Sequence, residues 1–300
     1  MVSMKNQDKK IYVSRPFLPD YEEYSNLLKE VWSSCQLTNN GPMVHRLESG
    51  LKKHLGVSDL NFVGNGTLAL QLSFKALELK GKVLTTPFSF VATTSSLAWE
   101  GLEYDFVDID PNTFNVDVNK VREKLEKGEY EAFLFTHVFG NPCNVLAIDK
   151  LAKEFGVKVI YDAAHCFGVT HKDKSIFSFG DISVSSFHAT KVFHTVEGGL
   201  VVCSDHHLQS RVEKMMNFGL DSVSKEVVAV GINAKNSEVH AAMGVAVLPH
   251  MKTIIDKRRE LYEAYEESLN GHVEFQKLVE KEQYNYAYMP VLFESEETLL

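Results

Sequence analysis

A lysine in an unusually constrained stretch is the first sign of chemistry in this sequence. Lys191 lies in SFHATKVFHTVEGG, residues 186–199, between the strand-like DISVSSF and a second apolar segment that begins GGLVV. A lysine held at the end of a buried strand loses water, and desolvation lowers the pKa of its amine toward the range of a nucleophile or base. Most lysines are solvated charges on a protein surface. The other turns of the chain must therefore decide whether Lys191 is a reactive amine or an ordinary solvated lysine.

A glycine-rich turn offers a site for a phosphate. GNGTLA, residues 64–69, opens a predicted helix, where free N–H groups and the helix dipole bind anions. The turn also matches the G-x-G-x-x-A dinucleotide pattern, but the next strand, KVLTTPF, ends without the acidic residue that a ribose requires. A phosphate without an adenosine ribose therefore fits better, and a plain tight turn is the alternative.

Two further turns supply a carboxylate and an aromatic ring. Asp162 ends the apolar run VKVIYD, where a buried carboxylate needs a partner such as a protonated ring nitrogen, or else caps a helix. In PFSFVATT, Phe88 or Phe90 offers a flat face to a ring or is buried under the next helix. A phosphate site, an aromatic face, a carboxylate and an amine are the four contacts that pyridoxal phosphate (PLP) needs.

The elements that must position these turns alternate between strands and helices from about residue 60. Continuous apolar strands separated by helices predict an α/β fold with a mostly parallel sheet and helices on both faces. The predicted strands and helices are, in chain order, 61–66, helix 67–79, 82–86, helix 93–101, 104–110, 132–140, helix 145–156, 157–165, 181–187 and 200–203.

The pattern changes near residue 250. Apolar residues at spacings of three and four predict a long amphipathic helix over 250–269, and HVEFQKL and YNYAYMPVLF follow as two predicted strands. We therefore expect a large domain over 1–247 and the start of a small α+β domain over 248–300. Because the sequence stops soon after these strands, we expect this small domain to be incomplete.

Composition narrows the classes of partner. The chain of 300 residues has 44% hydrophobic and 24% charged residues and a formal net charge of −9. This acidic balance argues against nucleic acid, and no apolar run is long enough to cross a bilayer. The four cysteines are scattered and no H-E-x-x-H occurs, so we expect no metal site. The sequence predicts a cytoplasmic protein with small-molecule substrates.

Together these motifs resemble a known family. GNGTLAL, YDAAH, SFHATK…EGG and the later GINAKNSEVHAAMG are similar to segments of the DegT/DnrJ/EryC1/StrS family of PLP-dependent sugar-nucleotide aminotransferases. The resemblance runs from RPFLP and LTNNGP near the N-terminus to about residue 265. It implies the type I, aspartate aminotransferase-like fold.

The resemblance assigns roles to residues around the cofactor ring. It implies that Lys191 carries PLP as an internal aldimine and then moves the proton during transamination. Asp162 would pair with the pyridine nitrogen, so that the ring acts as an electron sink. His165 would take the place of the family's Gln or His beside the ring's 3-oxygen, and Phe90 would stack on the ring.

The remaining roles concern the phosphate and the partner subunit. By the same resemblance, Gly66, Thr67 and Ser186 hold the cofactor phosphate. Lys235, in GINAKNSE, matches a position that usually reaches the phosphate bound by the neighbouring subunit. The resemblance therefore implies a homodimer whose two active sites each take residues from both chains.

The implied reaction is amino transfer from an amino acid, L-glutamate by analogy, to a nucleotide-linked keto-deoxy sugar. Family members that lack the lysine act as dehydratases, so Lys191 favours transamination. SFHATK with EGG resembles members that aminate C4 of a 4-keto-6-deoxyhexose, whereas members acting at C3 more often read SFYPGK…DGG. Two alternatives stay open: a PLP-binding homologue without full activity, because the small domain stops early, and a nicotinamide-dependent oxidoreductase resting on GNGTLA.

Overall fold

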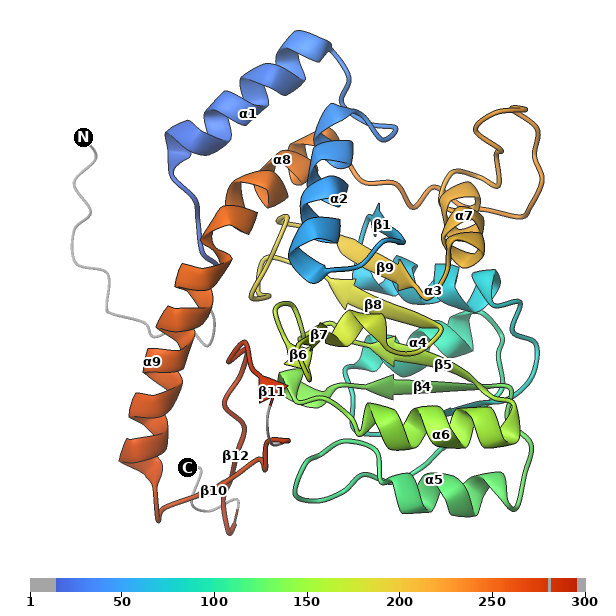
Figure 1. The fold of residues 1–300 in the computed structure, drawn as a ribbon, viewed down its shortest axis with the longest axis vertical. Helices are drawn as coiled ribbons and strands as arrows, with labels where there is room; N and C mark the ends of the chain where they lie inside the picture. Colours follow the sequence, from blue (N-terminus) through green and yellow to red (C-terminus); the bar gives the residue numbers. More distant parts are fainter. Residues whose placement is uncertain (1–14, 280–281, 296–300) are drawn as a thin grey trace.

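The computed structural model describes residues 15–279 and 282–295, and its centre is a seven-stranded sheet (Figure 1). All neighbouring strands pair in parallel except β9, which is antiparallel to both of its neighbours. The largely parallel sheet predicted from the sequence is therefore confirmed. In spatial order the strands are β1 (Leu60–Val63), β9 (Gly199–Cys203), β8 (Ile182–Ser186), β5 (Lys158–Asp162), β4 (Ala132–Thr136), β2 (Val83–Thr85) and β3 (Tyr104–Phe106).

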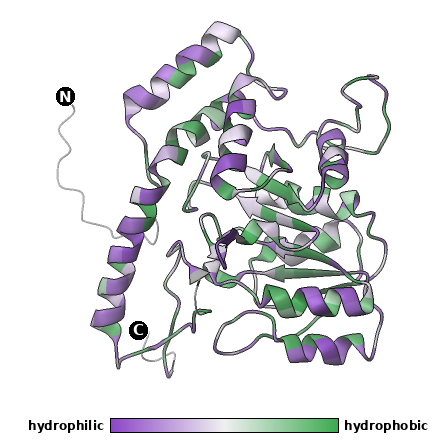
Figure 2. Cartoon of the chain, in the orientation of Figure 1, coloured by the Kyte–Doolittle hydropathy of each residue, from purple (hydrophilic) through white to green (hydrophobic). Residues whose placement is uncertain are grey.

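Helices cover both faces of this sheet, because alternate residues of the strands point to opposite sides. Within β4, Phe133 and Phe135 belong to one buried cluster and Ala132 and Leu134 to the other. Figure 2 shows hydrophobic strands between helices that carry both hydrophobic and hydrophilic residues. One cluster includes residues of α3 (Gly66–Ala76), α4 (Val91–Trp99) and α7 (His206–Met215); the other includes residues of α1 (Tyr21–Ser34), α2 (Pro42–Leu55), α5 (Val118–Leu125), α6 (Val145–Phe155), α8 (Glu238–Val247) and α9 (Met251–Leu269).

Local signals explain where individual helices begin and end. The side chain of Asn65 accepts a hydrogen bond from the Leu68 amide and so caps α3 at the predicted phosphate turn. α6 ends at Gly156, whose φ of 69° is the left-handed conformation that favours glycine, as the sequence predicted. None of the helices in the described ranges is long and apolar enough to cross a membrane.

The long helix predicted over 250–269 is confirmed as α9, but the chain after it differs from the prediction. Of the predicted strand 284–293, only β12 (Val291–Leu292) forms, pairing with β10 (Glu274–Phe275). The carbonyl groups of Tyr286 and Ala287 accept hydrogen bonds from Arg258 of α9 instead of from another strand. The remaining short elements are β6 (Thr170–His171), β7 (Lys174–Ser175), β11 (Glu282–Gln283), η1 (Val138–Gly140), η2 (Ile176–Ser178) and η3 (Leu248–His250).

Candidate active site

The predicted site residues converge at the carboxyl edge of the sheet, where ligands bind in open α/β folds. β4 and β5 end in register, with Thr136 opposite Asp162, and β8 ends beside them at Ser186. A pocket of about 760 Å³ opens there, within the size range of small-molecule sites. The predicted residues that line it are Gly66, Thr67, Phe90, Asp162, His165, Ser186 and Lys191.

One end of the pocket is suited to a phosphate. Gly66 is the first residue of α3, so the free N–H groups of this helix face the pocket. A Cβ at Gly66 would lie 3.1 Å from Cβ of Ser186, so the missing side chain lets the turn lie against β8. A Cβ at Gly199 would overlap the carbonyl group of Asn65, which explains why β9 begins with glycine. Thr67 and Ser186, which both carry hydroxyl groups, also line the pocket.

Asp162 lies at the end of β5 and is 7% exposed. Its Oδ2 accepts a hydrogen bond from Thr93 Oγ1 at 2.7 Å, and its Oδ1 accepts one from the Ala164 amide at 3.1 Å. Burial raises the pKa of this carboxyl group, and the positive charge of Lys191 opposes the increase. No helix begins at Asp162, so the N-cap interpretation is wrong, and the carboxylate faces the pocket.

A chain of hydroxyl groups, in which Thr93 is buried and Ser89 and Thr136 are partly buried, supports Asp162, and the sequence prediction missed it. Ser89 Oγ lies 2.6 Å from Thr93 Oγ1 and 2.8 Å from Thr136 Oγ1. Thr93 has no exposed surface. These residues follow β2 and end β4, so only the order of strands in the sheet reveals that they meet Asp162.

Replacing Thr93 with valine should weaken PLP binding about 10- to 100-fold, because hydrogen bonds to charged groups contribute about 1.5–3 kcal/mol. Without this donor the pKa of Asp162 rises further and less of the carboxylate is ionised. Titration of the apoprotein with PLP, followed by fluorescence, measures the change. Thr94→Val on the same helix is the matched control and should bind as the wild type does. Equal affinity in Thr93→Val would show that the hydroxyl chain has no such role.

Lys191 follows β8 in a turn where its amide donates to the His188 carbonyl group at 2.9 Å. Desolvation lowers the pKa of the amine, and the nearby charge of Asp162 partly opposes this shift. The amine is therefore closer to its neutral, nucleophilic form at neutral pH than an exposed lysine is.

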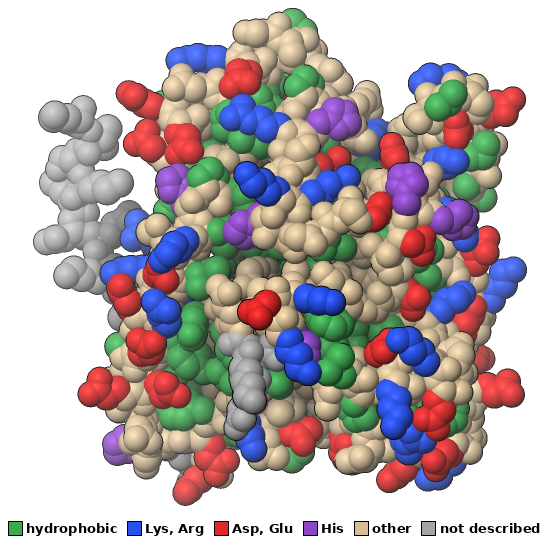
Figure 3. Space-filling view, in the orientation of Figure 1, with side chains coloured by type: hydrophobic (Ala, Val, Ile, Leu, Met, Phe, Trp, Pro, Cys, Tyr) green, Lys and Arg blue, Asp and Glu red, His purple; other side chains and the backbone are tan. Residues whose placement is uncertain are grey.

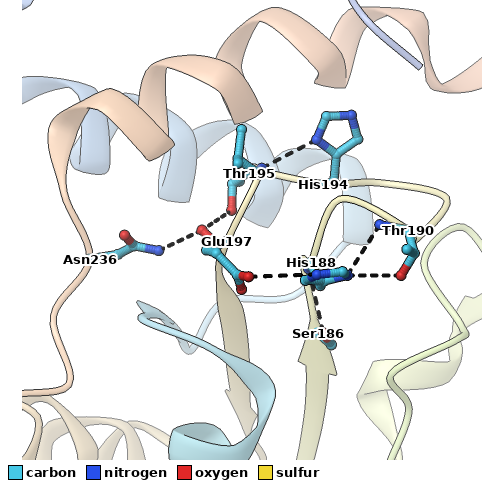
Figure 4. Close-up of polar contacts among 8 residues, drawn as sticks. Ser186, His188, Thr190, His194, Thr195, Glu197 and Asn236 are labelled. Carbon is cyan, nitrogen blue, oxygen red and sulfur yellow. Dashed lines mark hydrogen bonds and ion pairs between the residues drawn. The ribbon is translucent and has the colours of Figure 1, made fainter. Parts of the chain in front are cut away.

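The loop around Lys191 is held by polar contacts that Figure 4 shows. The Glu197 carbonyl oxygen accepts hydrogen bonds from Thr195 Oγ1 at 2.8 Å and from Asn236 Nδ2 at 2.9 Å. His188 Nδ1 accepts from the Thr190 amide, and His188 Nε2 lies 3.6 Å from the Glu197 carboxylate. His188, Thr190 and Glu197 all line the pocket, so this loop forms its wall beside Lys191.

Aromatic rings form the remaining walls. Phe90 is 74% exposed and lines the pocket, so it is not buried under α4. Phe88 also lines the pocket and packs on Phe114 with ring centroids 5.7 Å apart. Burial lowers the pKa of His165 to about 3, and the charge of Lys191 adds to the effect, so this imidazole is neutral at physiological pH.

Lys235 is the one predicted residue that does not line the pocket of its own chain. Its Nζ donates to Asn217 Oδ1 at 2.6 Å and lies 4.7 Å from the centre of the Phe218 ring. Burial lowers the pKa of this amine. Lys235 thus lies beside the loop that follows α7, outside the pocket of its own chain.

Comparison with known proteins agrees with this geometry. The sequence profile of the DegT/DnrJ/EryC1/StrS aminotransferase family matches residues 20–299. A dTDP-4-amino-4,6-dideoxy-D-glucose transaminase of Shigella dysenteriae is 42% identical over 292 residues, which cover 96% of this chain and 79% of the relative. The transaminase of the same description from Escherichia coli is 36% identical, covering 96% of this chain and 78% of the relative.

Solved structures show the same likeness. The structure of DesI, determined in the presence of its TDP-sugar product, superposes with a TM-score of 0.90 at 34% sequence identity. The match covers 96% of this chain and 74% of DesI. Sequence and fold therefore point to one family.

Proposed function

The chain belongs to the DegT/DnrJ/EryC1/StrS family of PLP-dependent aminotransferases, and we propose that it transfers an amino group from L-glutamate to C4 of a dTDP-linked 4-keto-6-deoxyhexose. The observation that carries the proposal is that Lys191, Asp162 and the N-terminus of α3 border one pocket. Similarity to two dTDP-4-amino-4,6-dideoxy-D-glucose transaminases supports the choice of sugar and carbon. The nicotinamide alternative lacks support, because β2 is followed by Thr86 and Pro87 instead of an acidic residue.

The pocket fits PLP at three points. The N-terminus of α3, with Gly66, Thr67 and Ser186, would hold the phosphate. Asp162, buried and with its pKa raised, would gain a charge-assisted hydrogen bond from the protonated ring nitrogen. The exposed face of Phe90 is available for stacking on the ring.

When bound, PLP supplies an electron sink that stabilises a carbanion next to nitrogen. Lys191 would hold the cofactor aldehyde in the resting state and, once displaced by the amino donor, its Nζ would accept the proton from the donor's α-carbon. In the second half-reaction the same Nζ would deliver a proton to C4 of the sugar. The lowered pKa of Lys191 suits both proton transfers. Neutral His165 would donate a hydrogen bond to the 3-oxygen of the cofactor ring without adding a positive charge there.

Product analysis tests the proposed reaction. Incubation with dTDP-4-keto-6-deoxyglucose, PLP and ¹⁵N-labelled glutamate should yield a sugar whose labelled amine is attached to C4, as read by ¹H–¹⁵N NMR. If the 4-keto sugar gave no labelled product and the 3-keto isomer gave a product labelled at C3, the proposal of C4 as the aminated carbon would be wrong. PLP binding without product from either sugar would instead support the homologue without full activity.

We further propose a homodimer with shared active sites. The loop after α7 stands clear of the sheet in Figure 1, and Figure 3 shows hydrophobic side chains beside charged ones on this part of the surface. An exposed apolar loop of this kind is typical of a protein interface. Its most exposed apolar residues are Val223 (88%), Val227 (72%) and Val230 (91%).

Mixing two inactive variants tests the sharing of sites. If Lys235 serves the partner's site, Lys191→Ala and Lys235→Ala chains refolded together should recover about a quarter of wild-type activity, because half of the dimers have one intact site. The mixture should stay inactive if Lys235 acts only in its own chain. Val230→Asp in both chains is the control: it should produce monomers in sedimentation analysis and prevent the recovery.

A further inference from the structure

The chain beyond α9 returns to the catalytic pocket at Tyr288. This tyrosine lines the pocket, and its ring lies 4.7 Å from the His165 ring and 5.8 Å from the Phe139 ring, centroid to centroid. Phe139 stacks almost parallel to His165, at an interplanar angle of 7°. The three rings contact one another, so His165 packs against a ring that follows β4 and a ring that lies more than 120 residues further along the chain.

Packing alone orients the His165 ring. Within residues 15–279 and 282–295, neither ring nitrogen of His165 has a hydrogen-bond partner, so the imidazole plane depends on its two aromatic neighbours. Of these, Tyr288 is the closer. Aromatic pairs contribute about 0.5–1.5 kcal/mol beyond their buried area, which is enough to favour one ring orientation.

Asn285 fixes the backbone on which His165 stands. It is 1% exposed, and its Nδ2 donates to the carbonyl groups of His165 at 2.7 Å and Phe167 at 2.9 Å. Its Oδ1 accepts from the Ala287 amide at 3.1 Å. A Cβ at Gly140 would approach both this Oδ1 and the His165 carbonyl oxygen to 3.0 Å, and the φ of 90° at Gly140 is strained for any other residue, so the neighbouring turn favours glycine.

The other side of the segment is held by α9. Arg258 Nη1 donates to the carbonyl groups of Tyr286 at 3.4 Å and Ala287 at 3.1 Å, and burial lowers the pKa of this guanidinium. Tyr286 has a left-handed backbone, with φ of 52°, and its ring packs edge-on against Tyr262 of α9. Residues 285–288 are thus tied both to α9 and to the turn that contains His165.

We propose that residues 285–288 form a positioning strap: Asn285 sets the backbone of His165, and Tyr288 sets the plane of its imidazole against the pocket. The consequence for catalysis rests on the proposed function, in which His165 lies beside the 3-oxygen of the cofactor ring. In that setting the strap holds the imidazole where it can donate to this oxygen.

Nuclear magnetic resonance of the apoprotein tests the strap without the cofactor. With ¹⁵N-labelled histidine, and His165 assigned from His165→Gln, the wild type and Tyr288→Phe should show a neutral imidazole from pH 5 to 8. Tyr288→Ala opens this site to water, so the pKa of His165 should rise toward 6.5 even though Lys191, the nearest positive charge, still opposes protonation. Leucine is smaller than tyrosine and has no ring, so Tyr288→Leu should also admit water to the imidazole and show the same change if the alanine variant does not fold.

Kinetics of the loaded enzyme provide the second measurement. The kcat for the sugar half-reaction should fall about 3- to 10-fold in Tyr288→Leu and recover in Tyr288→Phe. Tyr265→Ala, which removes an exposed ring from α9 that contacts neither the strap nor His165, should leave kcat and the imidazole titration unchanged. An unaltered His165 spectrum in Tyr288→Leu would overturn the strap. If the wild type failed to bind PLP while replacement of Tyr288 still changed the titration of His165, the proposal of the strap would be supported and the proposed function would be wrong.

Discussion

Replacing Lys191 with alanine should lower turnover of the keto sugar by about 10²–10⁴-fold, the range that a positioned acid–base group contributes. Lys191 is the only lysine among the described residues that line the pocket, and desolvation lowers the pKa of its amine. The phosphate and ring-nitrogen contacts remain in this variant, so PLP should still bind, though without covalent attachment. Single-turnover absorbance measurements of each half-reaction would follow both effects.

Lys191→Arg is the matched control for charge. The guanidinium keeps a cation near Asp162 but stays protonated, so it should be as inactive as the alanine variant. Added methylamine should restore part of the activity of Lys191→Ala, because a small amine can enter the vacated space and accept the proton. A Lys191→Ala enzyme that turned over at the normal rate would remove this residue from the mechanism.

Asp162→Asn should reduce kcat by about 10²–10³-fold, since losing one partner of a buried ion pair costs about 3–5 kcal/mol. The amide cannot stabilise a protonated ring nitrogen as a carboxylate does, so the bound ring withdraws electrons less well. Rapid-mixing absorbance measurements with glutamate alone isolate the first half-reaction, whose rate should fall in this variant.

The stability of the apoprotein separates this effect from misfolding. Burial raises the pKa of Asp162, which means that its ionised form is disfavoured in the apoprotein even though the charge of Lys191 opposes the increase. Asparagine has the same shape, and the hydroxyl of Thr93 can reverse its hydrogen bond to suit the amide. The melting temperature of apo Asp162→Asn should therefore equal or exceed that of the wild type. A variant that kept normal kcat would contradict the ion pair with the ring nitrogen.

The sequence indicated most of the pocket because each key residue carries a local signal. Gly66 and Lys191 follow buried strands and Asp162 ends one, and the carboxyl ends of parallel strands meet at one edge. The sequence left open whether Phe90 offers a flat face to a ring or is buried under the next helix, and its exposure in the pocket excludes burial.

Other features depend on contacts that no local pattern encodes. Thr93 reads as an ordinary helical threonine until the order of β5, β4 and β2 places it against Asp162. Tyr288 lies in a run of alternating residues that predicts a strand. Instead of forming a strand ladder, the carbonyl groups of Tyr286 and Ala287 bind Arg258, and the side chain of Asn285 binds the carbonyl group of His165. In both cases the deciding partner is distant in sequence.

The most direct test of the central claim is to locate the covalent attachment of the cofactor. Protein loaded with PLP should show a visible absorption band that shifts on addition of glutamate. Reduction with borohydride, digestion and mass spectrometry should then find a pyridoxyl group on the peptide that contains Lys191. A modified peptide carrying another lysine, or no visible band at saturating PLP, would contradict the account.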